Sequence, residues 1–319
     1  MSFSVVIPTF RRPDTLVPVL DALAVQAEPP EFEVVVIDDG SGDDTPSRLA
    51  AYRPSYPFRF FSQPNSGPAA ARNRGVREAR NPIVLFLGDD TVPERRLLSV
   101  HARAHAEPRP HPVAVLGYTT WPLELKVSPF LHHINEYGLQ FGYGLIDDPD
   151  SVPFNFFYTS NVSLPRALLL EAGLFDTSFP HAAWEDIEVA YRLMQRGMRM
   201  LYRPEAVARH HHDITFESFR RRQEKAGEAA AIFYRKHPEL ADFLAVPLAR
   251  RLSERRGLAL RLLPRWAALA QRAEWPGARW ALDRVLKDDY LRGLKKGLGN
   301  GDGSHDARGD ASSPTAYGG

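Results

Sequence analysis

The chain has 319 residues, of which 44 % are hydrophobic and 25 % charged, an ordinary globular composition with room for one large domain or a domain with an appendage. Lys and Arg together number 40 and Asp and Glu 39, so the overall charge argues against nucleic acid or any other polyanion as a partner. The absence of cysteine excludes disulfides, thiolate metal sites and a cysteine nucleophile.

The N-terminus enters an apolar run directly and lacks the basic segment, long apolar core and small-residue cleavage site of a secretory signal. No stretch of the sequence approaches the roughly 18 apolar residues that a membrane-spanning helix needs. We therefore expect a cytoplasmic protein.

Residues 1–117 alternate short apolar runs with helical patterns, which predicts parallel strands joined by crossover helices. The predicted strands are residues 4–7, 33–37, 58–61, 83–87 and 112–116. The predicted helices are one with Leu16, Leu20 and Leu23 on its apolar face, then residues 45–52, 68–80 and 94–106. This arrangement is typical of half of a nucleotide-binding α/β fold.

The next segment, residues 118–157, is rich in aromatics and prolines and has no sustained period, so we expect loops that form a lid over a ligand. A strand is predicted at 157–164, and helices at 166–172 and 185–196. The last helix carries a Glu188–Arg192 pair four residues apart and ends at Gly197.

From residue 217 onward the pattern is mostly helical, and residues 300–319 have the composition of a disordered tail. Residues 249–300 contain 13 Lys or Arg and 5 Asp or Glu, so the basic charge is concentrated there. Leu258, Leu262, Trp266 and Leu269 recur at helical spacing among arginines at 255, 256, 261 and 265. This helix either lies on an anionic membrane surface or packs onto the rest of the protein, and Pro264 would bend or interrupt it.

Paired acids follow the apolar run at 83–87, in the order Gly88, Asp89, Asp90. A strand that ends in two carboxylates delivers oxygen ligands to the carboxyl edge of the sheet, where a divalent cation can hold a diphosphate. The alternative is a turn or a helix cap, in which the Asp side chains bond nearby backbone amides.

Polar residues also follow the first two strands, with Thr9 and Arg11 after one and Asp39 after the other. Parallel strand ends share one edge, and a carboxylate there suits the donor edge of uracil, thymine or guanine. A simple β-turn at 38–41 is the competing interpretation. Arg72 lies one turn inside a helix that begins after Gly67, and an arginine there could bind a phosphate or a ribose. The alternative is that this segment is an ordinary alanine-rich helix without a ligand.

Two later features complete the candidates. Asp186 lies in the first turn of a predicted helix, where it stabilises the helix dipole or acts as a general base that is already ionised at pH 7. Residues 210–212 are three consecutive histidines, and in an extended segment alternate side chains point to opposite faces, so one or two of them are candidate metal ligands.

Taken together, these motifs resemble the family 2 glycosyltransferases of the GT-A fold. The matching segments occur in family order between residues 3 and 212. They are Val-Val-Ile-Pro-Thr-Phe-Arg at 5–11, Val-Ile-Asp-Asp-Gly-Ser at 36–41, the 65–75 turn and helix, Phe-Leu-Gly-Asp-Asp-x-x-Pro at 86–93, Ser-Asn-Val-Ser at 160–163 with Gly-x-Phe-Asp at 173–176, and Trp-Glu-Asp-x-Glu at 184–188.

The resemblance implies an α/β GT-A fold, with a mostly parallel sheet flanked by helices and a C-terminal helical extension. It divides the chain into a catalytic domain at 1–215, with a nucleotide-binding half at 1–117 and an acceptor half at 118–215, then a helical region at 216–299 and a tail at 300–319. It implies inverting transfer from a UDP, dTDP or GDP sugar to a glycan or lipid-linked acceptor, as in the synthesis of cell-envelope polysaccharide. Localisation would be cytoplasmic, with peripheral contact at the inner face of the membrane through residues 249–296.

By position in the motifs, the resemblance also assigns roles to individual residues. The donor site would be formed by Pro8, Thr9, Arg11, Asp39, Arg72 and Asp89. The metal, Mn²⁺ or Mg²⁺, would be bound by Asp90 with His210 or His212. The catalytic residues would be Asp186, as the general base, and its neighbour Glu185.

One position departs from the family pattern, because many relatives have a third aspartate where this chain has Gly88. Three other functions compete. A Rossmann dehydrogenase and a sugar nucleotidyltransferase are disfavoured because the turn after the first strand lacks their glycine-rich phosphate loop. A non-catalytic nucleotide-sugar binder would not need a general base, so the presence of Asp186 argues against this alternative.

Overall fold

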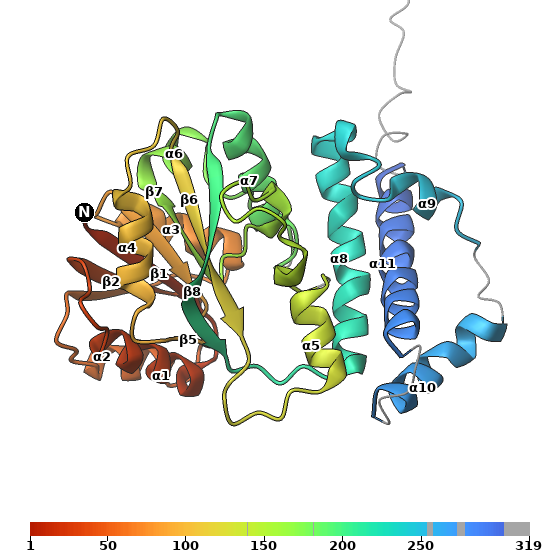
Figure 1. The fold of residues 1–319 in the computed structure, drawn as a ribbon, viewed down its shortest axis with the longest axis horizontal. Helices are drawn as coiled ribbons and strands as arrows, with labels where there is room; N and C mark the ends of the chain where they lie inside the picture. The colour runs from red at the N-terminus through yellow and green to blue at the C-terminus, as the bar shows by residue number, and fades with distance from the viewer. Residues whose placement is uncertain (139, 181, 254–257, 273–277, 303–319) are drawn as a thin grey trace, which may run out of the picture.

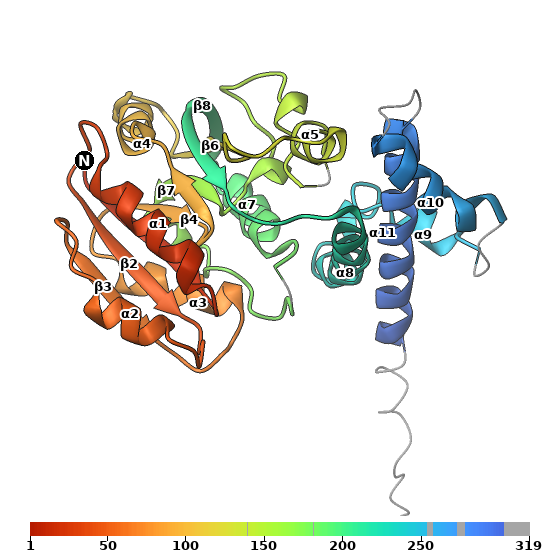
Figure 2. The ribbon, with the colours of Figure 1, turned by 90° about the horizontal axis from the view of Figure 1, so that it is seen from below.

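The computed structural model describes residues 1–138, 140–180, 182–253, 258–272 and 278–302. An eight-stranded sheet, in the order β3-β2-β1-β4-β7-β6-β8-β5, forms one part of the molecule, and a group of long helices stands beside it (Figure 1). The view from below separates the same two parts, with α8 and α11 at the far side from the sheet (Figure 2).

The predicted alternation of strands and helices in the first half is confirmed. The strands are β1 (Phe3–Thr9), β2 (Phe32–Asp38), β3 (Phe58–Ser62), β4 (Ile83–Leu87), β5 (Thr91–Pro93) and β6 (Val113–Thr120). The helices are α1 (Pro13–Ala24), α2 (Thr45–Ala51), α3 (Pro68–Glu78) and α4 (Leu97–Ala106). β1 pairs in parallel with both β2 and β4, as crossover helices require.

Alternate residues of the central strands pack on opposite faces of the sheet. Val5 and Ile7 of β1 lie in one core, against α1, α2 and α4. Val6, between them, lies in the other core, against α3 and the later helices. Gly75 on α3 allows this close approach, because a Cβ there would lie 2.3 Å from Cγ1 of Val6.

The second half makes the sheet mixed rather than mostly parallel. It contains α5 (Pro129–Glu136), the short 3-10 helices η1 (Tyr143–Leu145) and η2 (Phe154–Phe156), β7 (Asn161–Pro165), α6 (Arg166–Glu171), α7 (Glu185–Gln195) and β8 (Arg199–His210). β7 runs antiparallel to both β4 and β6, and β5 runs antiparallel to β8.

The sequence pattern did not predict β8, which pairs in parallel with β6. The pairing shifts register between Gly117 and Tyr118, whose partners are Arg203 and Val207. The intervening residues bulge out of the ladder, so the period of two on which strand prediction depends is lost within this strand.

The C-terminal region is helical, as predicted. It comprises α8 (Phe216–Lys236), η3 (Pro238–Leu240), α9 (Val246–Arg250), α10 (Leu258–Arg272) and α11 (Ala278–Asp302). A capping box of Thr215 and Ser218 begins α8. Helix α10 continues through Pro264 without interruption, whereas Arg255, Arg256 and residues 303–319 of the predicted tail lie outside the described residues. Among the helices that are described, none combines the length and hydropathy needed to cross a membrane.

Helices α8 and α11 lie side by side with their backbones in contact (Figures 1 and 2). A Cβ at Gly227 of α8 would lie 2.0 Å from the carbonyl oxygen of Tyr290, and one at Gly293 of α11 would lie 1.9 Å from that of Glu224. Neither position has room for a side chain, so glycine is what allows the two helices to pack this closely.

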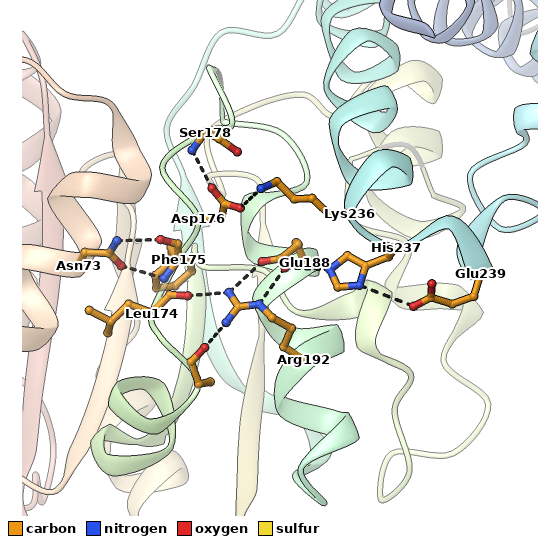
Figure 3. Close-up of polar contacts among 11 residues, drawn as sticks. Asn73, Leu174, Phe175, Asp176, Ser178, Glu188, Arg192, Lys236, His237 and Glu239 are labelled. Carbon is orange, nitrogen blue, oxygen red and sulfur yellow. Dashed lines mark hydrogen bonds and ion pairs between the residues drawn. The ribbon is translucent and has the colours of Figure 1, made fainter. Parts of the chain in front are cut away.

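Hydrogen bonds and ion pairs connect α7 to the loop before it and to the end of α8 (Figure 3). The predicted pair of Glu188 and Arg192 is present, with Nε 2.8 Å from Oε1, and Arg192 also donates to the Leu174 carbonyl. His237, just after α8, lies 3.0 Å from the same Glu188 oxygen, and Lys236 pairs with Asp176. Helix α7, which carries Asp186 in its first turn, is therefore held by groups from three segments.

Candidate active site

Strand pairing brings Asp90 and the histidines together. Thr91 of β5 pairs with His210 at the end of β8, and the backbone N–H of His211 donates to the Asp90 carbonyl at 2.7 Å. These main-chain contacts place the Asp90, His210 and His212 side chains at one point, with their ligand atoms within 4.8 Å of one another.

We call these three residues the Asp-His-His cluster. Nε2 of His210 and Nδ1 of His212 each lie 3.5 Å from Oδ2 of Asp90. The two rings are nearly parallel, and Trp121 stacks on His210 from 5.8 Å. Burial alone would raise the pKa of Asp90, but hydrogen bonds from the two histidines and the charge of Arg12 bring the pKa well below its usual range.

The cluster fits a divalent cation of the Mn²⁺ type, which accepts imidazole nitrogen together with carboxylate oxygen. Two imidazoles converge on one oxygen of a buried carboxylate, and among the described residues Nδ1 of His210 is buried without a hydrogen-bond partner.

Arg12, which was not among the predicted residues, contacts the same Asp90 oxygen. Its Nη1 also lies 3.4 Å from Oδ1 of Asp89, whose other oxygen accepts a hydrogen bond of 2.8 Å from Thr9. Burial and the charge of Asp90 raise the pKa of Asp89 to about 6. A cavity of about 370 Å³ beside these groups is lined by Arg11, Arg12, His211 and His212, and also by the acids Asp14 and Asp213. We call it the cationic cavity after its two arginines, which can contact anionic oxygens.

The predicted base-recognition residues are close to one another but already have partners. Arg11 has a left-handed φ of 55°, and its backbone N–H and Nε both donate to Ser41, at 2.9 Å. Asp39 is 4 % exposed, and its oxygens accept hydrogen bonds from Gln63 and from the backbone of Ser66 and Gly67. Three of the roughly four acceptor positions of the Asp39 carboxylate are therefore already used within the protein.

Arg72 and Glu185 form a buried ion pair of 2.7 Å that joins α3 to the start of α7. Within the described residues, Nε of Arg72 and Oε2 of Glu185 are buried without a partner. Buried polar atoms of this kind need water or a ligand to complete their hydrogen bonds. The pair is thus a candidate contact for a polar ligand.

Asp186 follows a strained residue and faces a large cavity. Trp184 has a left-handed φ of 73°, which is unusual for a bulky side chain, and its Nε1 donates to the Ala226 carbonyl of α8 at 2.8 Å. A cavity of about 640 Å³ begins at Asp186 and extends toward α8 and α11. Burial and the charge of Glu185 raise the pKa of Asp186 to about 7. A raised pKa makes this carboxyl a weaker acid than an exposed aspartate.

Gly88 is the position at which the sequence departs from the motif expected from the resemblance. A Cβ there would lie 2.6 Å from the Thr91 hydroxyl and 3.0 Å from Oδ1 of Asp90. The side chain of an aspartate at position 88 would be too close to Thr91 and Asp90 unless these residues moved. Glycine therefore fits this position in this chain.

Sequence reasoning missed Arg12, Trp121 and the residues of the helical region that line the large cavity. The signal for Arg12 was present, since two arginines follow β1 and either could turn toward the acids. The cavity-lining residues of α8 and α11 belong to no motif, and only the packing of the helices reveals them.

Comparisons with known proteins identify the family and the fold. The family model described as Glycosyl transferase family 2 matches residues 4–154. Validoxylamine A glucosyltransferase of Streptomyces hygroscopicus subsp. limoneus is 33 % identical over 266 residues, which cover 74 % of this chain and 57 % of that protein. Hyaluronan synthase of Pasteurella multocida is 27 % identical over 62 % of this chain and 23 % of its own length. The chain thus spans little more than half of the first relative.

Two solved structures share the fold. A mannosyltransferase from Pyrobaculum calidifontis in complex with GDP-Man and Mn²⁺ has a TM-score of 0.58 and 21 % identity, over 91 % of this chain and 87 % of that one. TarS 1–349 of S. aureus, in complex with UDP, has a TM-score of 0.54 and 18 % identity, over 98 % and 94 % of the two chains.

Proposed function

Since the chain belongs to glycosyl transferase family 2 and has the GT-A fold, we propose that it transfers a sugar from a nucleoside diphosphate sugar to an acceptor hydroxyl with inversion. The observation that carries this proposal is the Asp-His-His cluster at the carboxyl edge of the sheet, close to Asp89 and the cationic cavity beside it. The donor's nucleotide is UDP, dTDP or GDP.

In this proposal the donor lies between the cluster and the Arg72–Glu185 pair. Thr9, Arg11 and Asp39, with Pro8 at the end of β1, border the base and ribose, and Asp89 meets the ribose or the sugar. The cationic cavity with Arg12 receives the diphosphate. Arg72 and Glu185 offer their unpartnered atoms to sugar hydroxyls, which makes Glu185 a contact for the donor.

Asp90, His210 and His212 would hold Mn²⁺ or Mg²⁺, whose charge stabilises the departing diphosphate. Asp186 removes the proton from the acceptor hydroxyl through its carboxylate oxygen as that hydroxyl attacks the anomeric carbon. Attack from the face opposite the diphosphate inverts the configuration. Residues 1–215 form the catalytic domain, and the helical region from 216 completes the acceptor side.

Thermal shift with UDP, dTDP and GDP sugars, with and without Mn²⁺, tests donor and metal together, because a ligand of the native state raises the melting temperature. We expect one nucleotide to stabilise the protein more with Mn²⁺ than without it. Turnover of that donor separates an enzyme from a non-catalytic nucleotide-sugar binder. The absence of any nucleotide effect, with or without metal, would contradict the proposal.

We also propose that the protein touches an anionic membrane surface through α10 and the start of α11. Helix α10 packs through Leu263 and Ala267 onto the helical region, yet Leu269 and Trp280 are 58 % and 63 % exposed, and Leu262 and Trp266 are exposed beside them. Exposed apolar residues flanked by arginines favour anionic lipid. Flotation of the full chain with phosphatidylglycerol vesicles, but not with phosphatidylcholine vesicles, is expected, and Trp280→Glu should reduce it. Equal flotation with both lipids would oppose the electrostatic part of this proposal.

A further inference from the structure

The large cavity is a separate space from the one beside the Asp-His-His cluster. Asp186 lines this cavity, and none of Asp90, His210 and His212 does so. If the donor is held at the cluster, the cavity is the space open to the second substrate, so the assignment of an acceptor to it rests on the proposed function.

Two cations from the helical region project into this space. Arg222 of α8 donates to the side chain of Gln140, and its guanidinium lies 5.8 Å from the centre of the Phe219 ring. Arg222 lines the same cavity as Asp186, and although burial lowers the pKa of its guanidinium, the carboxylates of Asp186, Glu185 and Asp90 attract it.

Lys287 of α11 is the second cation. Its side chain is exposed to the cavity and, within the part of the chain that the structure describes, makes no hydrogen bond or ion pair. Lys296 on the same helix differs, because its Nζ lies 2.7 Å from Oε1 of Glu228. The one acid from α11 in the cavity wall, Asp283, is bonded to His133 at 2.7 Å. Lys287 is therefore available to a ligand.

Aromatic side chains form much of the remaining wall, including Phe141, Trp184, Phe243 and Tyr290. Flat apolar faces suit sugar rings, and an anion bound among them is partly shielded from water, which strengthens its hydrogen bonds to a lysine and an arginine.

We infer that the acceptor is an anionic sugar, carrying a phosphate or a carboxylate, and that Lys287 and Arg222 bind this group while an acceptor hydroxyl faces Asp186. Arg222 and Lys287 determine acceptor specificity in this scheme. They are separate from the residues assigned to the donor.

Calorimetric titration of the full chain with glucose 6-phosphate, glucuronate and glucose tests the inference. We expect at least one charged probe to bind about tenfold or more tightly than glucose, and comparison of the two charged probes distinguishes phosphate from carboxylate. Lys287→Ala and Arg222→Gln should each remove most of this preference, whereas Lys296→Ala should preserve it. Equal affinity for all three probes, or a preference that survives in both variants, would overturn the inference.

Donor binding is measured on the same samples to keep the two proposals apart. Metal-dependent nucleotide binding should be unchanged in Lys287→Ala, because Lys287 does not line the cationic cavity next to the cluster. If the charged-probe preference is present but no nucleotide binds, the proposed function fails and the anion site stands. If nucleotide binds normally but charged and neutral probes bind alike, only the anionic acceptor is wrong.

Discussion

The metal side and the acceptor side of this site are built in different ways. On the metal side, backbone pairing between β5 and β8 places Asp90 next to His210, so main-chain geometry positions the reactive groups. On the proposed acceptor side, helices α8 and α11 form one part of the cavity wall, next to residues between 138 and 187. The separation of the two helices is set by side-chain packing and by glycine contacts. Short motifs can encode the first arrangement, whereas the second depends on helices far apart in sequence.

The largest expected effect is at the residue between the two sides. Asp186→Asn should lower kcat by about 10²–10⁴-fold, the usual contribution of a general base, with donor binding retained. Asp283→Asn is the matched control, since it changes an acid of the same cavity that is not placed to act as base. Steady-state kinetics with saturating donor measures both variants. Near-normal turnover by Asp186→Asn would remove it as the base.

Asp90→Asn should weaken metal binding at the proposed metal side and leave the acceptor cavity unchanged. Loss of one of three ligands is expected to weaken Mn²⁺-dependent nucleotide binding by about tenfold or more, since even removal of a partner that orients a metal ligand typically costs 10–100-fold in affinity. Asp43→Asn, at an exposed acid in a polar loop, should bind as the unaltered chain does. Titration of nucleotide at several Mn²⁺ concentrations gives the comparison, and an unchanged metal dependence would exclude Asp90 as a ligand.

Gly293→Val should disturb the packing of α8 against α11 at the proposed acceptor side and leave the Asp-His-His cluster unchanged. The new side chain would overlap the Glu224 carbonyl, and we expect a loss of about 1–3 kcal/mol in the free energy of unfolding, with weaker acceptor binding. Gly299→Ala on the same helix is the control, because a Cβ there has open space and should stabilise by about 0.5–1 kcal/mol. Chemical denaturation measures both changes. Equal effects of the two substitutions would show that the glycine contact is unimportant.

The last prediction concerns the dependence of the rate on pH. Burial and Glu185 raise the pKa of Asp186 to about 7, so the active carboxylate is present above that pH and is lost as pH falls through it. The value of kcat/KM should fall about tenfold per unit below pH 7. Nucleotide binding measured in parallel at saturating Mn²⁺ separates this from protonation of the histidines. A rate that stays flat down to pH 5 would contradict the assignment.

The sequence allowed the first half of the fold to be predicted because its strands are apolar runs such as Ile83–Leu87 and its helices have clear apolar faces. Asp90 was recognised because it follows an apolar strand within a family motif, and His210 and His212 because three consecutive histidines stand out in the sequence. The route by which they meet was not predicted, because β8 contains a bulge and charged residues that conceal its alternation.

The helical region shows a second limit of prediction from sequence, which concerns contacts between residues far apart in the chain. Its helices were expected, but no local pattern shows that Arg222 and Lys287 share a cavity with Asp186, because their proximity results from contacts about 60 residues apart in the chain. Similarly, Arg12 and Arg11 are indistinguishable by position, and only the fold shows which one reaches the acids.

The glycine contacts between α8 and α11 also bear on regiochemistry. Because Gly227 and Gly293 hold the two backbones in contact, the backbone positions of Arg222 and Lys287 are fixed relative to each other, and only their side chains can adjust to the acceptor. The helix pair would thus limit the distance between the bound anion and the Asp186 carboxylate. We expect only the hydroxyl at that distance to be glycosylated, so a sugar whose charge is moved by one carbon should give a different linkage or none.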